Sequence, residues 1–418
     1  MKVQELFEPG EYLDQRGPGF FSILSKPTAR AKQDSYELSM LPTVVKHVDP
    51  DIDTWITQAV FSERNRRSVN MHSVGLLFVD LDTYHVPELA EKSPEAQAHL
   101  LATACERDGI PAPSIILFSG RGLQAKWLLT DSLGPVSLHD WNEAQLALVK
   151  SLEGFAADRA ARDISRVLRL EHTTNTKSKE KCRVVYTSSN SEVLARYEFE
   201  ALASLLTERY KESPLEDSRP TVATEETNSH IIRRAQPGFN FKRLNWFRYY
   251  DLDRLWKLRG GVPVGYREAT LFWMLNFLLR AEPVRIGAMW AEAQSLAKKI
   301  DPSKGWWNRS DLSSLYAKAK QFRDGATVKH HGKEYPPLYN PQNSYLIDLF
   351  KIEPGEEREM KTVISNTEKY RRKVEKRRAS GIRPREEYEA GSTEKQKPWV
   401  AEGISRRWWY EKRRRAKE

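Results

Sequence analysis

The stretch Val74–Asp82, VGLLFVDLD, decides the fold. It is a short apolar run of the kind that forms a buried strand. Ser114–Ser119 (SIILFS) repeats the pattern, and Gln124–Thr130 and Arg183–Thr187 are weaker strand candidates. Helical stretches alternate with these runs, at Pro94–Asp108 before Gly109 and at Leu138–Phe155 after Pro135. The alternation predicts an α/β or α+β domain.

Two carboxylates interrupt the end of the first run. Asp80 and Asp82 are two residues apart, so on a strand they project from the same face. Neighbouring carboxylates repel each other unless a divalent cation lies between them. Phosphoryl-transfer enzymes use such pairs to hold Mg²⁺ or Mn²⁺. Strand ends are often acidic for structural reasons, so this pair alone is a weak signal.

A glycine-flanked arginine follows the second strand, in Ser119-Gly-Arg-Gly-Leu-Gln-Ala-Lys-Trp127. The two glycines let the backbone approach a ligand closely, and Arg121 and Lys126 supply positive charge for a phosphate. A tight hairpin turn with two surface cations would have the same sequence.

A third cluster runs from Asp158 through Arg166 and Arg169 to Lys177. A further carboxylate beside several cations is what a site for a metal and a triphosphate requires. An amphipathic helix with surface ion pairs is the structural alternative, because the spacing suits pairing four residues apart. The pattern does not decide between helix and strand.

Taken in order, VDLD, SGRGLQAKW and D-x7-R-x-L-R-L-x4-N-x-K resemble the three motifs of the archaeo-eukaryotic primase superfamily. The resemblance is greatest to primases and primase–polymerases of plasmids and integrated mobile elements, and covers about residues 60 to 190. It implies an α+β fold with a catalytic core built on an RRM-like antiparallel sheet. It also implies that Asp80, Asp82 and Asp158 are the catalytic, metal-binding triad, with Mg²⁺ or Mn²⁺ as cofactor.

The same resemblance assigns the remaining site residues. In that family the third acid is followed by arginines 8 and 11 positions later, which Asp158 has and Asp163 lacks; Asp163 is kept as the alternative ligand. Gln124 stands where the family usually has a histidine, and a glutamine donates hydrogen bonds but carries no charge. The expected nucleotide-binding residues are Ser119, Arg121, Gln124, Lys126, Arg166, Arg169 and Lys177.

The positive charge of the chain is confined to its end. Residues 361–418 carry 19 Lys and Arg against 9 Asp and Glu, which accounts for the whole net charge of +10. A localised basic block indicates contact with a phosphate backbone, or else a solvated helical tail. The two cysteines, the polar first residues and the lack of a long apolar run favour a cytoplasmic protein with no membrane segment.

The sequence divides into four parts. Residues 1–210 are expected to form the catalytic domain, 211–240 a polar linker, 241–335 an all-α domain and 336–418 a basic helical tail. In the third part, helices are expected at Arg267–Arg280, Ile286–Lys299 and Ser310–Phe322, the last with Ser310 as N-cap.

Two further regions are candidate DNA contacts. Trp306 and Trp307 lie in a loop next to cations, which suits stacking on unpaired bases, although tryptophan is also a common core residue. Near the C-terminus, Gly403 and Ser405 would precede a helix in a helix-turn-helix, with Arg406, Arg407 and Trp409 at its groove-facing end. A disordered basic tail is the alternative, and Lys369–Arg378 could form a helix that contacts the DNA backbone.

These observations predict a metal-dependent DNA primase, a nucleotidyltransferase that joins nucleoside triphosphates on a single-stranded DNA template in plasmid or mobile-element replication. Duplex origin DNA is a further expected partner. A replicative helicase would be a separate protein, since no GxxxxGK[ST] motif occurs. The alternative is a DNA-binding replication initiator or regulator whose nucleotidyltransferase core is inactive.

Overall fold

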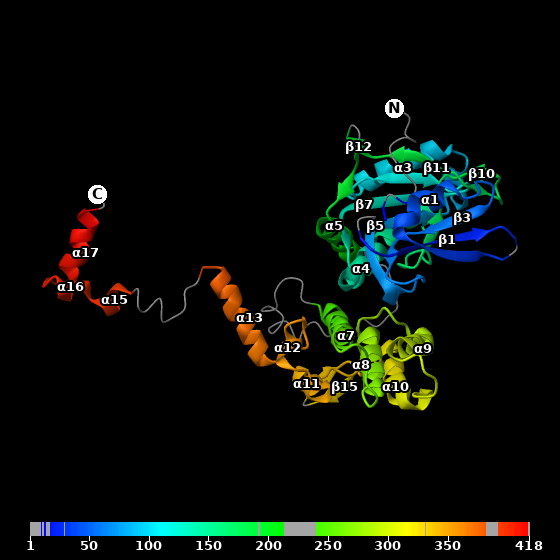
Figure 1. The fold of residues 1–418 in the computed structure, drawn as a ribbon. Helices are drawn as coiled ribbons and strands as arrows, with labels where there is room; N and C mark the ends of the chain where they lie inside the picture. The colour runs from blue at the N-terminus through cyan, green and yellow to red at the C-terminus, as the bar shows by residue number, and fades with distance from the viewer. Residues whose placement is uncertain are drawn as a thin grey trace. The chain divides into compact units, whose positions relative to one another are not determined.

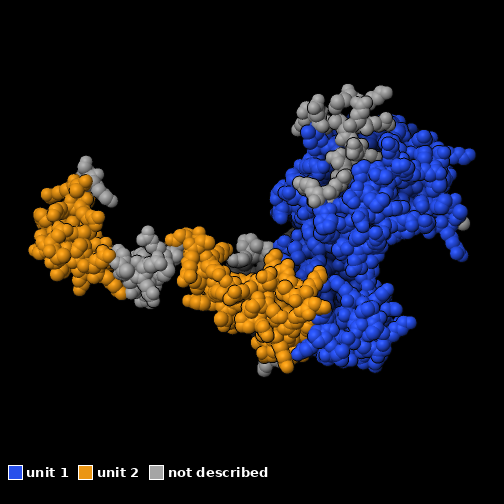
Figure 2. Space-filling model, in the orientation of Figure 1, with its two compact units in different colours: residues 1–253, 261–339 blue, residues 254–260, 340–418 orange. Residues whose placement is uncertain are grey.

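The computed structural model describes residues 10, 12–13, 17–28, 30–190, 193–212, 240–330, 332–381 and 392–416. The chain divides into two compact units, one of residues 1–253 with 261–339 and one of 254–260 with 340–418 (Figure 2). The first unit therefore contains the predicted catalytic region and most of the predicted helical domain. Nearly all of the predicted linker, 213–239, lies outside the described residues.

A ten-stranded sheet in the order β11-β6-β7-β5-β4-β1-β3-β8 forms the body of the first unit, with β2 paired to β1 and β14 to β7 (Figure 1). All pairings are antiparallel except that of β14. The sheet and its helices confirm the predicted α+β class. The strands are β1 (Phe20–Lys26), β2 (Lys32–Glu37), β3 (Asp53–Thr57), β4 (Val60–Phe61), β5 (Met71–Leu81), β6 (Ile115–Phe118), β7 (Leu123–Leu133), β8 (Val167–Arg169), β11 (Arg183–Thr187) and β14 (Arg196–Tyr197).

Five helices accompany this sheet in the catalytic region: α1 (Leu41–Lys46), α2 (Pro87–Ala90), α3 (Pro94–Arg107), α4 (Leu138–Ser151) and α5 (Phe199–Glu212). α4 and α5 pack against each other (Figure 1). α4 also packs against β5, α5 against β7, and α3 against β11. Short pairs of strands lie outside the main sheet, β9 (Thr174–Asn175) with β10 (Glu180–Lys181) and β12 (Ser189–Asn190) with β13 (Val193–Leu194).

β5 is buried on both faces, because all residues from Val74 to Val79 are shielded from solvent. All of them except Gly75 carry apolar side chains. One edge of its C-terminal half pairs with β7. β4 covers the other edge only near Met71 and Ser73. Side chains of α4 form hydrogen bonds with the backbone N–H and carbonyl groups along the next part of that edge. Trp141 donates its indole N–H to the carbonyl of Leu76 at 2.9 Å, and the Gln145 amide bonds both backbone groups of Phe78.

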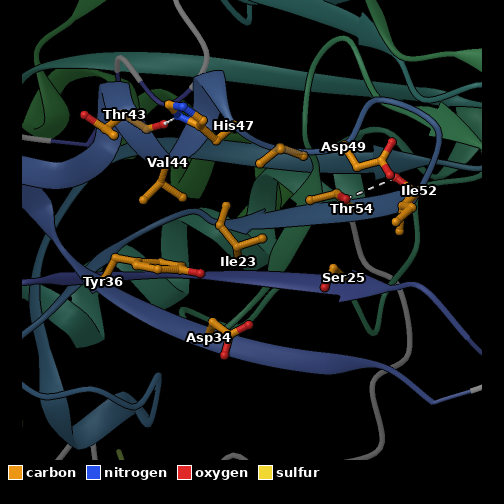
Figure 3. Close-up of a pocket in the computed structure, with 11 residues that line it drawn as sticks. Ile23, Ser25, Asp34, Tyr36, Thr43, Val44, His47, Asp49, Ile52 and Thr54 are labelled. Atoms are coloured by element: carbon orange, nitrogen blue, oxygen red, sulfur yellow. Dashed lines mark hydrogen bonds between the residues drawn. The ribbon is translucent and has the colours of Figure 1, made fainter.

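The strands β2, β1, β3 and β8 form the other half of the sheet, and one face of it is covered by α1. A cavity of about 490 Å³ lies between α1 and this face (Figure 3). Ile23, Tyr36 and Thr54 are among the residues that line it, together with His47 of the segment after α1. The opposite face carries Leu24 and Trp55, because successive residues of a strand point to opposite sides.

The region predicted to be all-α is mostly helical: α7 (Phe241–Leu258), α8 (Arg267–Arg280), α9 (Met289–Ile300) and α10 (Ser313–Arg323). It also contains a small hairpin of β15 (Val328–His330) and β16 (Lys333–Tyr335), so the all-α prediction was wrong. Each strand has only three residues, too few to show an alternating pattern.

The predicted cap of the third helix was also wrong. Asn308 accepts a hydrogen bond from the backbone N–H of Ser310, and the Asp311 carboxylate accepts one from the Asn308 N–H, which forms a capping box. This box begins a 3₁₀ turn, Arg309–Leu312, and α10 begins after it. Both residues are good caps, and the reciprocal bond from Asp311 selects Asn308.

The second unit contains α11 (Asn343–Phe350), α12 (Pro354–Glu357) and α13 (Asn366–Ala379), followed after residue 391 by α15 (Thr393–Gln396), α16 (Pro398–Ala401) and α17 (Arg406–Arg415). α13 and α17 correspond to the two basic helices that the sequence predicted. Ser405 caps α17 by accepting a hydrogen bond from the Trp408 N–H at 3.3 Å, as predicted. Among the described residues, no helix combines the length and the apolar character needed to cross a bilayer.

The role of α4 at the edge of β5 can be tested with Gln145→Leu. This change leaves the buried N–H and carbonyl of Phe78 without partners, so we expect the free energy of unfolding to fall by about 2–4 kcal/mol. Asn142→Leu, on the exposed side of the same helix, is the matched control. Urea denaturation measures both, and equal stabilities for the two variants would contradict this role.

Candidate active site

The three predicted metal ligands meet at the C-terminal end of β5. Asp80 is the penultimate residue of β5, and Asp82 follows the strand directly. The chain then returns after α4 and pairs with the same edge of β5. The N–H of Asp82 donates to the carbonyl of Ala156 at 3.0 Å, and the N–H of Asp158 donates to the carbonyl of Asp80 at 2.8 Å. This short ladder places the backbone of Asp158 beside that of Asp80.

The three carboxyl groups interact electrostatically. The pKa of Asp80 is raised to about 6, first by burial and then by the neighbouring charge of Asp82. Asp158 raises this pKa further, while a hydrogen bond from Gln124 and the charge of Arg166 lower it. A partly buried carboxyl beside two other acids is a group that a cation would stabilise in its ionised form.

The donor set suits a divalent cation, with one adjustment. Mg²⁺ and Mn²⁺ prefer carboxylate oxygens, and Asp80, Asp82 and Asp158 offer only such ligands. As they stand, no three His, Cys, Asp or Glu side chains in the described part of the chain converge closely enough to hold a metal ion. The backbones of the three acids are joined by hydrogen bonds, and their side chains would have to turn toward one another to share an ion.

Gln124 contacts the acidic cluster directly. It lies opposite Asp80 in the β5–β7 pairing, and its Nε2 donates to Asp80 Oδ1 at 3.4 Å. Its Oε1 is buried and has no hydrogen-bond partner among the described residues. Gln124 therefore bonds a predicted metal ligand and keeps one buried polar atom without a partner among the described residues.

The glycine-flanked turn is pressed against the end of β5. The Ser119 N–H donates to the Gly122 carbonyl at 2.9 Å and closes the turn. A Cβ added to Gly122 would lie 2.2 Å from the carbonyl oxygen of Leu81, so only glycine fits there. Gly120 has φ of +90°, and a Cβ on it would lie 2.5 Å from that of Asn175.

Two exposed cations stand on this turn and its neighbour. The Arg121 guanidinium lies 4.0 Å from the centre of the Tyr84 ring, and the Tyr84 hydroxyl donates to Asp82 at 2.9 Å. Lys177 follows Asn175, whose side-chain amide donates to the Ser119 carbonyl at 3.0 Å. Arg121 and Lys177 are therefore carried by two turns that a hydrogen bond joins, and Arg121 is linked to the acidic cluster through Tyr84.

Tyr84 and Asn175 were not among the predicted site residues. Asn175 was visible as part of the third motif, but its bond to the second motif could not be read from the sequence. For Tyr84 the available signal was its position two residues after Asp82.

Asp163, the alternative third ligand, is engaged elsewhere. Its carboxylate accepts hydrogen bonds from the N–H and hydroxyl of Ser165 and pairs with Arg166 at 3.2 Å. Arg166 also donates to the carbonyl of Ala160. These contacts close a local turn. The Asp158 carboxylate likewise accepts a bond from the Ala160 N–H at 2.8 Å, but Asp158, unlike Asp163, is among the charges that shift the pKa of Asp80.

Two predicted phosphate ligands form internal ion pairs instead of facing solvent. Lys126 is fully buried and lies 3.5 Å from Glu171. Arg169 lies 2.7 Å from Asp53, which also accepts a bond from the Thr176 N–H at 3.1 Å. In this structure Arg169 thus fixes the turn that carries Lys177. The acidic partners are 45 and 116 residues distant in sequence, so no local pattern could reveal them.

The two tryptophans of the 301–309 loop are half-buried. Trp306 donates its indole N–H to the carbonyl of Asp301 at 3.1 Å. Trp307 lines a small cavity with Phe272 and Leu312. Part of each ring remains accessible, and their contact with DNA stays a prediction.

The predicted recognition residues of the tail differ in exposure. Trp409 is 6% exposed; its ring centre lies 6.1 Å from that of Trp399, and its indole donates to Glu402 at 3.0 Å. It therefore belongs to the small core that holds α17. Arg407 is exposed, and Arg406, which pairs with Glu394, is also exposed. Trp408, 54% exposed, and Tyr410, 44% exposed, are aromatic side chains of α17 that face solvent.

Comparison with known proteins identifies several relatives, although no protein-family model matches the chain. A curated "Replication protein" of Clostridium perfringens is 24% identical over 319 residues, which are 75% of this chain and 69% of that protein. Three solved structures are similar at lower identity. The AEP domain of the cyanophage S-2L Primase-Polymerase is 16% identical and covers 45% of this chain and 89% of its own, with a TM-score of 0.32.

The other two solved structures are of primase RepB′. Its catalytic domain in complex with initiator DNA is 15% identical and covers 47% of this chain and 90% of its own, with a TM-score of 0.29. A second structure of the same primase is 14% identical and covers 73% of this chain and 94% of its own, with a TM-score of 0.31.

The raised pKa of Asp80 predicts a pH-dependent cost in stability when divalent cations are chelated. Because the folded-state pKa of about 6 exceeds the ordinary value of 3.8, ionisation of Asp80 destabilises the fold as the pH rises from about 4 to 6. Asp80→Asn removes this cost, so we expect it to be more stable than the wild type by roughly 3 kcal/mol at pH 7. Asp131→Asn makes the same change at an exposed site on β7. Equal pH profiles for Asp80→Asn and wild type in EDTA would refute the interpretation.

Because the turn packs closely against β5, we expect Gly122→Ala to lower the stability of the fold strongly. The added methyl group meets the Leu81 carbonyl, so the turn must move away from Asp82, and we expect stability to fall by about 2 kcal/mol or more. Gly134→Ala is the control, since a Cβ there has no neighbour within 4 Å. Thermal unfolding compares the two, and a Gly122→Ala variant as stable as its control would show that the close approach is unimportant.

Proposed function

We propose that this chain is a metal-dependent DNA primase, or primase–polymerase, that synthesises primers on single-stranded DNA in plasmid or mobile-element replication. The observation that carries the proposal is the backbone pairing of residues 156–158 with the end of β5. It joins Asp158 to Asp80 and Asp82, three acids from distant parts of the sequence. A purely structural role would not call for three like charges at one place.

The reaction proposed is nucleotidyl transfer. A 3′-hydroxyl oxygen forms a bond to the α-phosphorus of a nucleoside triphosphate, and the bond to the leaving pyrophosphate breaks. A divalent cation held by Asp80, Asp82 and Asp158 would lower the pKa of the hydroxyl and neutralise the triphosphate. The partial burial of Asp80 excludes water from one side of the cluster and strengthens these interactions.

The chain's own cations would bind the triphosphate. Arg121 and Lys177 are exposed and lie on two turns that are joined through the side chain of Asn175. The Arg121 guanidinium packs on Tyr84. The stacking of Arg121 on Tyr84 limits its freedom, and Tyr84 in turn donates to Asp82. Gln124 would orient Asp80 through its amide. Each of these groups positions a reacting partner without changing its own charge.

The expected partners follow from this reaction. They are nucleoside triphosphates, a single-stranded DNA template and a separate helicase, in the cytoplasm. The basic helices α13 and α17 would contact duplex DNA at an origin through their exposed lysines and arginines.

An assay of primer synthesis without a primer tests the proposal. Single-stranded DNA, labelled nucleotides and Mg²⁺ or Mn²⁺ should give short products with the wild type. Asp80→Asn and Asp82→Asn should each reduce the rate at least 100-fold, because each removes a negative ligand, whereas Asp131→Asn should leave it unchanged. Products that persist in both site variants would refute the site.

One observation favours the alternative of an inactive core in a DNA-binding initiator. Gln124 stands where the primases that the sequence resembles usually have a histidine, and its Nε2 donates a hydrogen bond to Oδ1 of Asp80. Gln124→His distinguishes the two functions. If the wild type makes no product while Gln124→His does, the core has been inactivated by this residue. If neither makes product but the chain binds duplex DNA tightly, the initiator function is favoured.

A further inference from the structure

One row of side chains crosses four strands on the face of the β2–β1–β3–β8 half-sheet opposite α1, where Ser22 and Thr57 are buried but the middle of the row is partly exposed. Gln33 is paired with Leu24, Leu24 with Trp55, and Trp55 with Arg169. Because residues paired across antiparallel strands project from the same face, these four side chains form a continuous line. None of them belongs to the predicted catalytic triad.

The centre of this row is apolar and accessible. Leu24 and Trp55 are half-buried, and Gln33 is exposed. The opposite face of the same strands is packed under α1, where Ile23, Tyr36 and Thr54 line the cavity shown in Figure 3. A tryptophan on the solvent side of a sheet offers a flat ring that packing inside the fold does not require.

Cations surround the row. Arg169 lies 4.8 Å from the centre of the Trp55 ring and is neutralised by Asp53. Arg66 is different: among the described residues it forms no ion pair, and it donates instead to Gln33 at 2.7 Å and to the carbonyl of Ser165 at 2.6 Å. Lys26, two residues after Leu24, is exposed on the same face. The row thus combines an aromatic ring with two cations, Arg66 and Lys26, that form no ion pair among the described residues, although the charge of Asp163 acts on Arg66.

The row is continuous with the acidic cluster. Arg66 bridges from Gln33 to Ser165, and Ser165 precedes Arg166, whose charge acts on both Arg66 and Asp80. A strand of nucleic acid that lay along the row would therefore pass Arg66 and Arg166 before it reached Asp80.

We propose that Trp55 and Leu24 form a stacking platform for an unpaired base of the single-stranded template, with Arg66 and Lys26 contacting the adjacent phosphates. The inference rests on the proposed function and names a residue set beyond its three motifs. A flat aromatic ring on a sheet, flanked by cations, is how single-stranded nucleic acids are held without sequence preference. Duplex DNA would not present an unstacked base to such a ring.

Crosslinking of the full-length wild type tests this contact without any variant. An oligothymidylate that carries 5-iododeoxyuridine is irradiated with the protein, and the crosslinked peptide is identified by mass spectrometry. We expect a crosslink to Trp55. Crosslinks found only in residues 241–418 would overturn the proposal.

Variants measure the contribution of the ring. Trp55→Ala should weaken binding of a short oligothymidylate about tenfold, while Trp55→Phe, which keeps an aromatic ring, should remain within about threefold of the wild type. Tyr36→Ala removes an aromatic side chain from the opposite face of the same half-sheet, and Trp408→Ala removes the exposed tryptophan of α17. Both controls should match the wild type at high salt, where the basic tail contributes least.

The outcomes separate this inference from the proposed function. Loss of binding in Trp55→Ala supports the platform even if the protein makes no primers. Unchanged oligonucleotide affinity in Trp55→Ala overturns it, even if primers are made. If Trp55→Ala instead raises the KM for nucleoside triphosphate and leaves template binding intact, the ring serves the incoming nucleotide and the template assignment is wrong.

Discussion

The free edge of β5 is the constraint on which the rest of the structure depends. A buried strand must have both rows of backbone groups paired, but β7 pairs with one edge of β5 from Val74 to Leu81 while β4 pairs with the other edge only near Met71 and Ser73. α4 supplies two side chains for the gap, and the returning chain supplies Ala156 and Asp158. The requirement to satisfy the backbone of β5 is therefore also what brings the third acid to the first two.

The geometry of the site follows from how closely the surrounding turns approach this strand. Gly122 allows the turn between β6 and β7 to touch the Leu81 carbonyl, and Asn175 fixes the next turn against it. Arg121 and Lys177 are exposed on these two turns, and in the proposed reaction they would bind the triphosphate. The buried pair Arg169–Asp53 holds the turn that carries Lys177, and Lys126 and Glu171 form a second buried pair, each at a cost in desolvation.

Local patterns in the sequence predicted much of this arrangement. β5, β6, β7 and β11 overlap the four predicted strands, and α3 and α4 lie within or match the predicted helices. The positions of Asp80 and Asp82 on one face of β5 followed from the period of two residues. The ion pairs of Lys126 and Arg169 could not be predicted, because both partners are distant in sequence and acidic residues are common. β1 to β3 were not predicted individually, and with them the face that carries Trp55 was missed.

The central claim is that Asp158, and not Asp163, completes a cation site with Asp80 and Asp82. Binding of Mn²⁺ to the full-length protein, followed by electron paramagnetic resonance without nucleotide or DNA, tests it most directly. The account predicts that Asp158→Asn weakens Mn²⁺ binding at least tenfold, as Asp80→Asn does, and that Asp163→Asn binds like the wild type. Wild-type affinity in Asp158→Asn, or loss of binding in Asp163→Asn alone, would contradict it.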